Sequence, residues 1–306
     1  MATRLFSRRG VIHNAKYHAR RGIVVSSVEP PLDVPIERPE RIVLAESSLY
    51  ESSWIERAES FFPSNGLHFV AIDIMRALRN NTNNDDVASQ FKCLEKSMAE
   101  DLSHLGETTD EWQQTSTSAH DVLIARGPIQ CLIAQYYIES LPLAGVVLID
   151  PLLLPEDGRA GIQQEGRGNR WKPSVLDFIS MLENEALHLH EGHTNIPPPL
   201  LFPVEDTSKL ESSKELSLLQ SLADDKVYNN RPLRLEPGSL PVLVMYSGDH
   251  IYHDYYRICS ERTAAFHTCG GSGDYFDQVS VLKISRTDDL DGVMKRIYEW
   301  YDDVVA

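Results

Sequence analysis

Residues 121–151 constrain the fold more than any other stretch of this chain, because they form one complete strand–helix–strand pattern. Residues 122–124 are a short apolar run typical of a buried strand, and residues 146–149 are a second. Residues 125–129 hold a glycine followed by a proline, which predicts a tight turn, and residues 131–141 have helical spacing. Two buried strands joined by a helix within about 30 residues make a βαβ unit, so a parallel sheet is expected.

The same alternation of strands and helices continues on both sides of this unit. Near-continuous apolar runs predict strands, whereas apolar residues spaced by three and four predict helices. Further strands are expected at residues 41–45, 67–72, 241–246 and 279–284, and further helices at residues 54–62, 86–105 and 288–303. Because strands of this kind need cover on both faces, the sequence predicts a mostly parallel, doubly wound α/β sheet.

The net charge of the 306-residue chain is −16, which argues against nucleic acid as a partner. Binding to nucleic-acid phosphates needs clustered Lys and Arg. An acidic balance fits either a solvated surface or a basic partner. No apolar run reaches the roughly 18 residues that a membrane-spanning helix requires, so no transmembrane segment is expected.

The charge is unevenly distributed, because residues 1–28 contain no Asp or Glu. They carry six basic side chains: Arg4, Arg8, Arg9, Lys16, Arg20 and Arg21. An Arg-rich, acid-free start without a continuous apolar segment is typical of an organellar transit peptide. Residues 1–28 are therefore predicted to be a targeting leader, mitochondrial rather than plastid, with the mature chain beginning near residues 22–28. A disordered basic tail on a cytoplasmic protein is the alternative.

The cysteine and histidine patterns predict neither a disulfide framework nor a metal site. The four cysteines, Cys93, Cys131, Cys259 and Cys269, show no C-x-x-C spacing, which favours free thiols in a reducing compartment. His188, His190 and His193 are the weak candidates for metal ligands, but zinc needs ligands directed at one centre, and residues two apart diverge on a helix. We expect surface histidines there, and no metal or other cofactor.

The turn at residues 125–129, the helix that contains IAQYY and the strand VVLIDP together resemble the α/β-hydrolase superfamily around its G-x-S-x-G turn. This resemblance covers roughly residues 41–150 and 241–303. It implies a hydrolase-like core formed by residues 29–150 and 241–306. It also implies that residues 151–240 are a helical cap inserted into that core.

The resemblance places Gly127 at the position of the family's nucleophilic serine, and glycine cannot form a covalent intermediate. Pro128 follows at the position whose N–H helps to bind the oxyanion, and proline has no N–H. After the first strand, Glu46 stands where family members usually have a His-Gly pair. Its carboxylate would repel an oxyanion, and a solvated loop acid is the alternative.

The remaining members of the family's catalytic triad are incomplete. Asp249 follows the strand at 241–246, as the family's catalytic acid does, and is either a relic of that acid or a turn residue. The loop at 285–289, where the catalytic histidine is expected, contains no histidine. His267 precedes the last strand and is a poor substitute. Cys131 lies one helical turn beyond the glycine, so its thiol is expected to pack against the sheet.

These positions favour a protein without hydrolase chemistry, although enzyme status stays open. The leading hypothesis is a noncatalytic hydrolase-like protein that serves as a structural or regulatory subunit of a mitochondrial complex with other protein chains. One alternative is a pseudo-hydrolase that binds a small apolar ligand in the old substrate pocket under the cap. Another is an atypical hydrolase or lyase that relies on Asp249.

Overall fold

The computed structural model describes the sheet and the helices that cover it. The described residues are 23–34, 38, 40–46, 53–79, 87–106, 120–139, 141–151, 218, 240–247, 253–268, 279–284 and 290–305. Nearly all of residues 151–240, the expected cap, therefore lie outside the described residues, as do the first 22 residues of the expected leader.

Seven strands form a single sheet in the order β1-β3-β2-β4-β5-β6-β7. Their bounds are β1 Val24–Val28, β2 Arg41–Glu46, β3 His68–Ile72, β4 Asp121–Arg126, β5 Gly145–Ile149, β6 Val242–Ser247 and β7 Val279–Ile284. Only the pairing of β1 with β3 is antiparallel; the other five pairings are parallel. The mostly parallel sheet predicted from the sequence is therefore confirmed.

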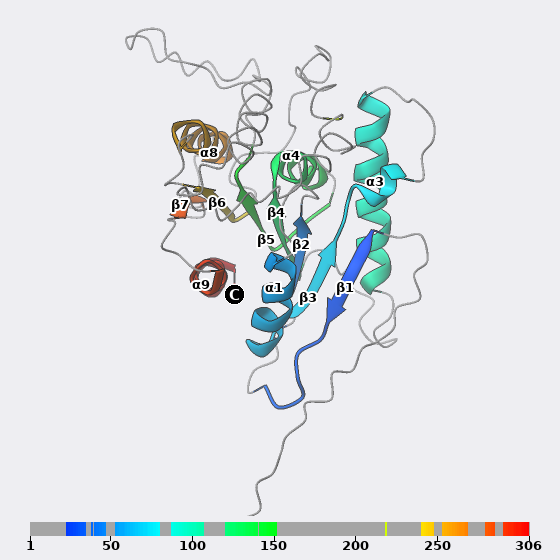
Figure 1. The fold of residues 1–306 in the computed structure, drawn as a ribbon, viewed down its shortest axis with the longest axis vertical. Helices are drawn as coiled ribbons and strands as arrows, with labels where there is room; N and C mark the ends of the chain where they lie inside the picture. The colour runs from blue at the N-terminus through cyan, green and yellow to red at the C-terminus, as the bar shows by residue number, and fades with distance from the viewer. Residues whose placement is uncertain are drawn as a thin grey trace, which may run out of the picture.

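Helices cover both faces of the sheet (Figure 1). The bounds of the principal helices are α1 Ser53–Ser64, α3 Val87–Gly106, α4 Pro128–Tyr137, α8 His253–Thr268 and α9 Leu290–Trp300, with a short α2 at Arg76–Arg79. Helix α1 packs against α9, and α3 packs against α4. Because right-handed crossovers leading in opposite directions from the centre of a sheet lie on opposite faces, α1 and α4 cover different faces.

Strands β2 and β4 are matched by charge at both ends. Their register pairs Arg41 with Asp121 at the first position and Glu46 with Arg126 at the last. Both pairs form ion pairs whose side chains are buried. An antiparallel alignment would instead oppose Arg41 to Arg126, and like charges directly opposite each other are destabilising. The charged ends therefore favour the parallel arrangement.

The two ion pairs also lie on opposite faces, since residues 41 and 46 differ by an odd number of positions. Arg41 donates to Asp121 from Nε at 2.8 Å and from Nη2 at 2.6 Å, and it also contacts the carbonyl of Leu102 in α3 at 3.4 Å. This pair thus faces α3. Between the two pairs, strands β2 and β4 contribute only buried apolar side chains.

The C-terminal helix closes the sheet at the start of β5. A Cβ atom built on Gly145 would lie 3.0 Å from the Trp300 ring and 3.1 Å from a methyl group of Val305. Glycine at this position therefore lets the end of α9 and the following π-helical turn, Tyr301–Val305, approach the strand closely. Arg57 of α1 forms an ion pair with Asp291, which holds α9 on the same face as α1.

Two elements differ from the sequence-based expectation. Strand β1 is formed by residues that the sequence assigns to the leader, so a removable leader would have to end before Ile23 to leave the sheet intact. Helix α8 occupies residues for which no helix was predicted. Its inward face carries buried polar residues, Ser260, Thr263 and His267, which hide the apolar stripe on which helix prediction depends.

Candidate functional site

The sheet has a topological switch point between β2 and β4. The chain leaves β2 toward β3 on one side and proceeds from β4 through β5, β6 and β7 on the other. In open α/β sheets, ligands bind outside the carboxyl ends of the strands at such a point. The residues that occupy this place are the last residues of the two strands, Glu46 and Arg126, and the turn that begins with Gly127.

The turn after β4 has a backbone conformation that only glycine adopts readily. Gly127 has φ 112° and ψ 162° and directly precedes α4, which begins with Pro128. Residues with side chains are strained in this region. The N–H of Gly127 donates to the carbonyl of Ile149 at 3.2 Å and so continues the pairing of β4 with β5. Position 127 therefore carries neither a nucleophile nor a spare backbone donor.

Glu46 is the final residue of β2, not the loop acid that the sequence suggested as one alternative. Its side chain is buried and forms an ion pair with Arg126, which is also buried. The Trp54 ring of α1 lies beneath the guanidinium, whose central carbon is 4.4 Å from the ring centroid. The three side chains therefore form a cluster at the switch point, the Glu46–Arg126–Trp54 cluster, in which Arg126 offsets the charge of the carboxylate.

Burial and pairing act on the Glu46 carboxyl in opposite directions. Removal from water disfavours the carboxylate, whereas the adjacent guanidinium favours it. Burial has the larger effect and raises the pKa of Glu46 to about 7. Its charge is consequently sensitive to pH near neutrality, which is unusual for a glutamate.

Gln130, in the first turn of α4, borders the Glu46–Arg126–Trp54 cluster. Its Nε2 lies 3.5 Å from the backbone carbonyl of Glu46. Its side chain is fully buried, and its Oε1 has no hydrogen-bond partner among the described residues. A buried amide oxygen without a donor is costly, so this atom is a place where a donor group would be stabilised.

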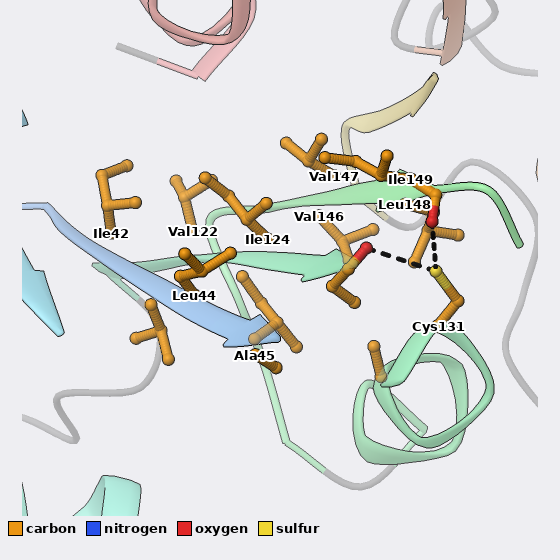
Figure 2. Packing of buried hydrophobic residues seen from close by; sticks show 14 of the residues in the cluster. Ile42, Leu44, Ala45, Val122, Ile124, Cys131, Val146, Val147, Leu148 and Ile149 are labelled. Carbon is orange, nitrogen blue, oxygen red and sulfur yellow. Dashed lines mark hydrogen bonds between the residues drawn. The ribbon is translucent and has the colours of Figure 1, made fainter. Parts of the chain in front are cut away.

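Cys131 packs inward and is not a substitute nucleophile, as the sequence predicted. Its Sγ lies 3.2 Å from the carbonyl of Ala125 and 3.3 Å from that of Ile149, between the ends of β4 and β5 (Figure 2). Burial raises the pKa of the thiol far above its usual range. Because the thiolate is the reactive form, a thiol with such a pKa is inert.

Asp150 is a second strained position at the carboxyl edge. It follows β5 with φ 52°, the one positive φ at a residue other than glycine in the described part of the chain. Its N–H donates to the carbonyl of Met245 at 2.9 Å, which ties the end of β5 to β6. The side chain is buried, and its negative charge contributes to the raised pKa of Cys131.

The structure separates His267 from this edge. Its Nε2 contacts Oε1 of Gln135 at 3.3 Å, a residue eight positions beyond Gly127 in α4. Burial lowers the pKa of His267 to about 4, so the imidazole is neutral at physiological pH. It therefore acts as a buried polar link between α8 and α4.

Four of the predicted site residues belong to other parts of the chain. Asp249 and the three weak metal-ligand candidates, His188, His190 and His193, lie outside the described residues. Within the described residues, no group of three or more potential metal ligands occurs, and no helix is long and apolar enough to cross a membrane. Conversely, Arg126, Trp54 and Gln130 belong to the site but were not predicted from the sequence. The signal for Arg126 was the pattern of opposite charges at the ends of β2 and β4.

No family model and no curated protein matches this sequence. Solved structures do resemble its fold. An esterase from Exiguobacterium antarcticum is 10% identical, with a TM-score of 0.51, over 93% of this chain and 100% of the esterase. A probable hydrolytic enzyme from Pseudomonas aeruginosa is 14% identical, with a TM-score of 0.49, over 92% of this chain and 88% of that one.

An α/β hydrolase from a lagoon-sediment metagenome is 9% identical, with a TM-score of 0.47, over 92% of this chain and 98% of that enzyme. Identities this low bear on the fold alone and leave activity open. The strand order, the helices on both faces and the likeness to the Exiguobacterium esterase agree with one another. The chain therefore has an α/β-hydrolase-like fold.

Proposed function

We propose that this protein is a noncatalytic member of the α/β-hydrolase fold that serves as a structural or regulatory subunit of a mitochondrial assembly. The observation that supports it most is the Glu46–Arg126–Trp54 cluster, because a buried ion pair fills the switch point where this type of sheet binds ligands. Gly127 beside it has no side chain and no spare N–H.

The absence of a nucleophile alone would be compatible with a retuned enzyme. The cluster adds a second obstacle, since two charges paired with each other in the protein interior are not available to stabilise a developing charge on a substrate. A paired Glu46 also carries a carboxylate at the place where an oxyanion would need donors. The missing nucleophile and the buried ion pair together favour a protein that binds partner chains through its surface and does not react with substrates at the switch point.

The subunit role is tested by the native size of the endogenous protein. Gentle solubilisation, size exclusion and mass spectrometry across the fractions should show the chain eluting well above its own mass of 34.5 kDa with a fixed set of companions. Elution as a lone chain would refute the subunit role. A fusion of residues 1–28 to a fluorescent protein tests the location, and a cytoplasmic signal would refute the mitochondrial part.

The noncatalytic part is tested separately with purified full-length protein. A fluorophosphonate probe, which labels activated serines, should leave the chain unlabelled, and a panel of short and long acyl esters should not be hydrolysed above the rate in buffer. An active serine hydrolase serves as the positive control. Labelling of a serine, or turnover that disappears in Asp249→Ala, would contradict the proposal and support the atypical hydrolase.

A further inference from the structure

The residue before strand β1, Ile23, is held by both of its backbone groups. Its N–H donates to Oδ2 of Asp101 at 2.5 Å, in helix α3, which lies beside β1 (Figure 1). Its carbonyl accepts the N–H of Asp73 at 2.8 Å. The Ile23 side chain belongs to the core and is only 1% exposed. The start of the sheet edge therefore depends on this residue.

Asp101 has an unusual partner for a half-buried carboxylate. Among the described residues, the backbone N–H of Ile23 is the one group that it contacts, and this group is neutral. Two cations of neighbouring segments have other carboxylate partners, in the pairs Lys96–Glu100 and Arg76–Asp73. A carboxylate removed from water is stabilised more by a cationic donor than by an amide. The nitrogen of Ile23 is therefore a place where a positive charge would be favourable.

In the sequence, the basic segment ends directly before this nitrogen. Its last two arginines are Arg20 and Arg21, Gly22 follows, and the next Lys or Arg is Arg38. An Arg-rich segment without acids is typical of a leader that directs a protein to an organelle. A cut between Gly22 and Ile23 would remove all the Lys and Arg residues of the leader and keep every described residue.

We propose that the peptide bond between Gly22 and Ile23 is a processing site, and that Asp101 pairs with the α-ammonium group formed there. A processing peptidase breaks the C–N bond with one water. The water oxygen joins the carbonyl carbon of Gly22, which becomes a carboxylate, and both water protons end on the Ile23 nitrogen. This nitrogen already lies 2.5 Å from Oδ2 of Asp101, so the pair forms where the amide bond to the carboxylate now lies.

The burial of Ile23 sets the order of events. A peptidase needs an exposed, extended segment on both sides of the bond that it cuts. In the folded chain, Ile23 is buried and its N–H and carbonyl are both hydrogen-bonded. Cleavage must therefore precede folding, as it does for a leader removed during import. The inference rests on the mitochondrial leader of the proposed function, and it does not depend on the subunit role.

The first test is the N-terminal peptide of the endogenous protein, identified by mass spectrometry after its free α-amine has been tagged. The expected chain begins at Ile23, and a chain that begins at any other residue overturns the inference. An uncut chain inside mitochondria would refute this inference and leave the proposed location standing. An uncut chain in the cytoplasm would refute both.

The second test measures the reactivity of the new α-amine in the mature endogenous protein. Only the neutral amine reacts with acetic anhydride, and an adjacent carboxylate favours the ammonium form. At neutral pH, acetylation at Ile23 should therefore be at least about tenfold slower in the folded protein than in concentrated urea. The exposed Lys92 serves as the internal control and should change little between the two states.

A variant separates pairing with Asp101 from simple burial. Asp101→Asn keeps an acceptor oxygen but removes the charge, so Ile23 of this variant should be acetylated several times faster than in the folded wild type. The matched control is Asp291→Asn, which removes the carboxylate of an ion pair on α9, over the opposite face of the sheet. It should protect Ile23 as well as the wild type does.

Three results would overturn the pairing. One is a wild type whose Ile23 is acetylated as fast when folded as when unfolded, and this result needs no variant. Another is Asp101→Asn with the full protection of the wild type, because burial alone would then explain the slow reaction. The third is an equal loss of protection in Asp291→Asn, which would indicate a general loosening of the fold. Thermal unfolding establishes that each variant is folded.

Discussion

A serine placed at position 127 separates the loss of a nucleophile from the loss of the site around it. Gly127 has φ 112° and ψ 162°, a conformation in which a residue with a side chain costs about 1–3 kcal/mol. The strain comes from the Cβ atom, which serine and alanine share. Gly127→Ser and Gly127→Ala should therefore lower the free energy of unfolding by the same amount, within that range.

Urea unfolding followed by circular dichroism measures this loss. With an m-value of roughly 3 kcal/mol/M, it corresponds to a midpoint lowered by about 0.3–1 M. The serine variant should also remain inactive toward esters, because Pro128 provides no N–H and the Glu46–Arg126 pair fills the adjacent space. A serine variant as stable as the wild type would refute the strain argument. Ester turnover by serine but not by alanine would refute the conclusion that the site is closed.

Four further perturbations test the packing and the charges. Arg126→Met should lower the free energy of unfolding by about 3–5 kcal/mol, measured by urea unfolding, because it leaves the buried Glu46 without the opposite charge of Arg126. The double variant Glu46→Leu/Arg126→Met should recover most of that loss. If the losses of the two single variants simply add in the double variant, the two residues are not a coupled pair. The pKa of Glu46 is raised to about 7 in the folded state, so the folded chain binds this proton more tightly than the unfolded chain does. The free energy of unfolding of the wild type, relative to that of Glu46→Gln, should therefore fall as pH rises from about 4.5 to about 7 and stay constant above. The pH dependence from His267 has the opposite sign, because burial lowers its pKa to about 4. Relative to His267→Gln, the wild type should lose stability as pH falls from about 6.5 toward 4. If the stabilities of the two proteins change in parallel across this range, His267 is not buried as a neutral ring. Finally, Gly145→Val should cost about 1–3 kcal/mol in thermal unfolding, since its side chain would push against Trp300, and an unchanged melting temperature would show that the end of α9 can move away.

The sheet could be predicted from the sequence because most of its strands are marked by their apolar composition. Parallel strands buried on both faces need continuous apolar runs, and such runs mark β2, β3, β4, β5 and β6. The βαβ unit around Gly127 was also predictable, since a glycine and a proline between a strand and a helix leave few alternatives to a tight turn. The bounds shifted by a few residues; α4, for example, begins at Pro128 rather than at Cys131.

Elements whose inward faces are polar could not be predicted in the same way. Helix α8 turns Ser260, Thr263 and His267 toward the interior, so its apolar stripe is interrupted. Strand β1 lies at the edge of the sheet, where two of its five residues are serines, and it follows the basic segment that dominates the start of the chain. In both cases tertiary contacts, rather than local pattern, define the element.

The Glu46–Arg126 pair illustrates what sequence reasoning lacked at the candidate site. Each charge was visible at the end of an apolar run, but the two residues are 80 positions apart. Recognising them as partners requires the knowledge that β2 and β4 are neighbours in register, which follows from the sheet order and not from spacing along the chain. Without that knowledge, the sequence predicts Glu46 as the first residue of a loop, with no opposite charge beside it.

The charge-matched ends of β2 and β4 restrict how this sequence can diverge during evolution. Each of the four charged residues faces an opposite charge in the interior, so substitutions are expected to be retained when both members of a pair change together: Arg41 with Asp121, and Glu46 with Arg126. Between the ends, exchanges among Val, Ile and Leu cost typically below about 1.5 kcal/mol and can accumulate one at a time. Among distant descendants of this chain, the apolar interior of the two strands should therefore drift freely, while the charges at their ends covary.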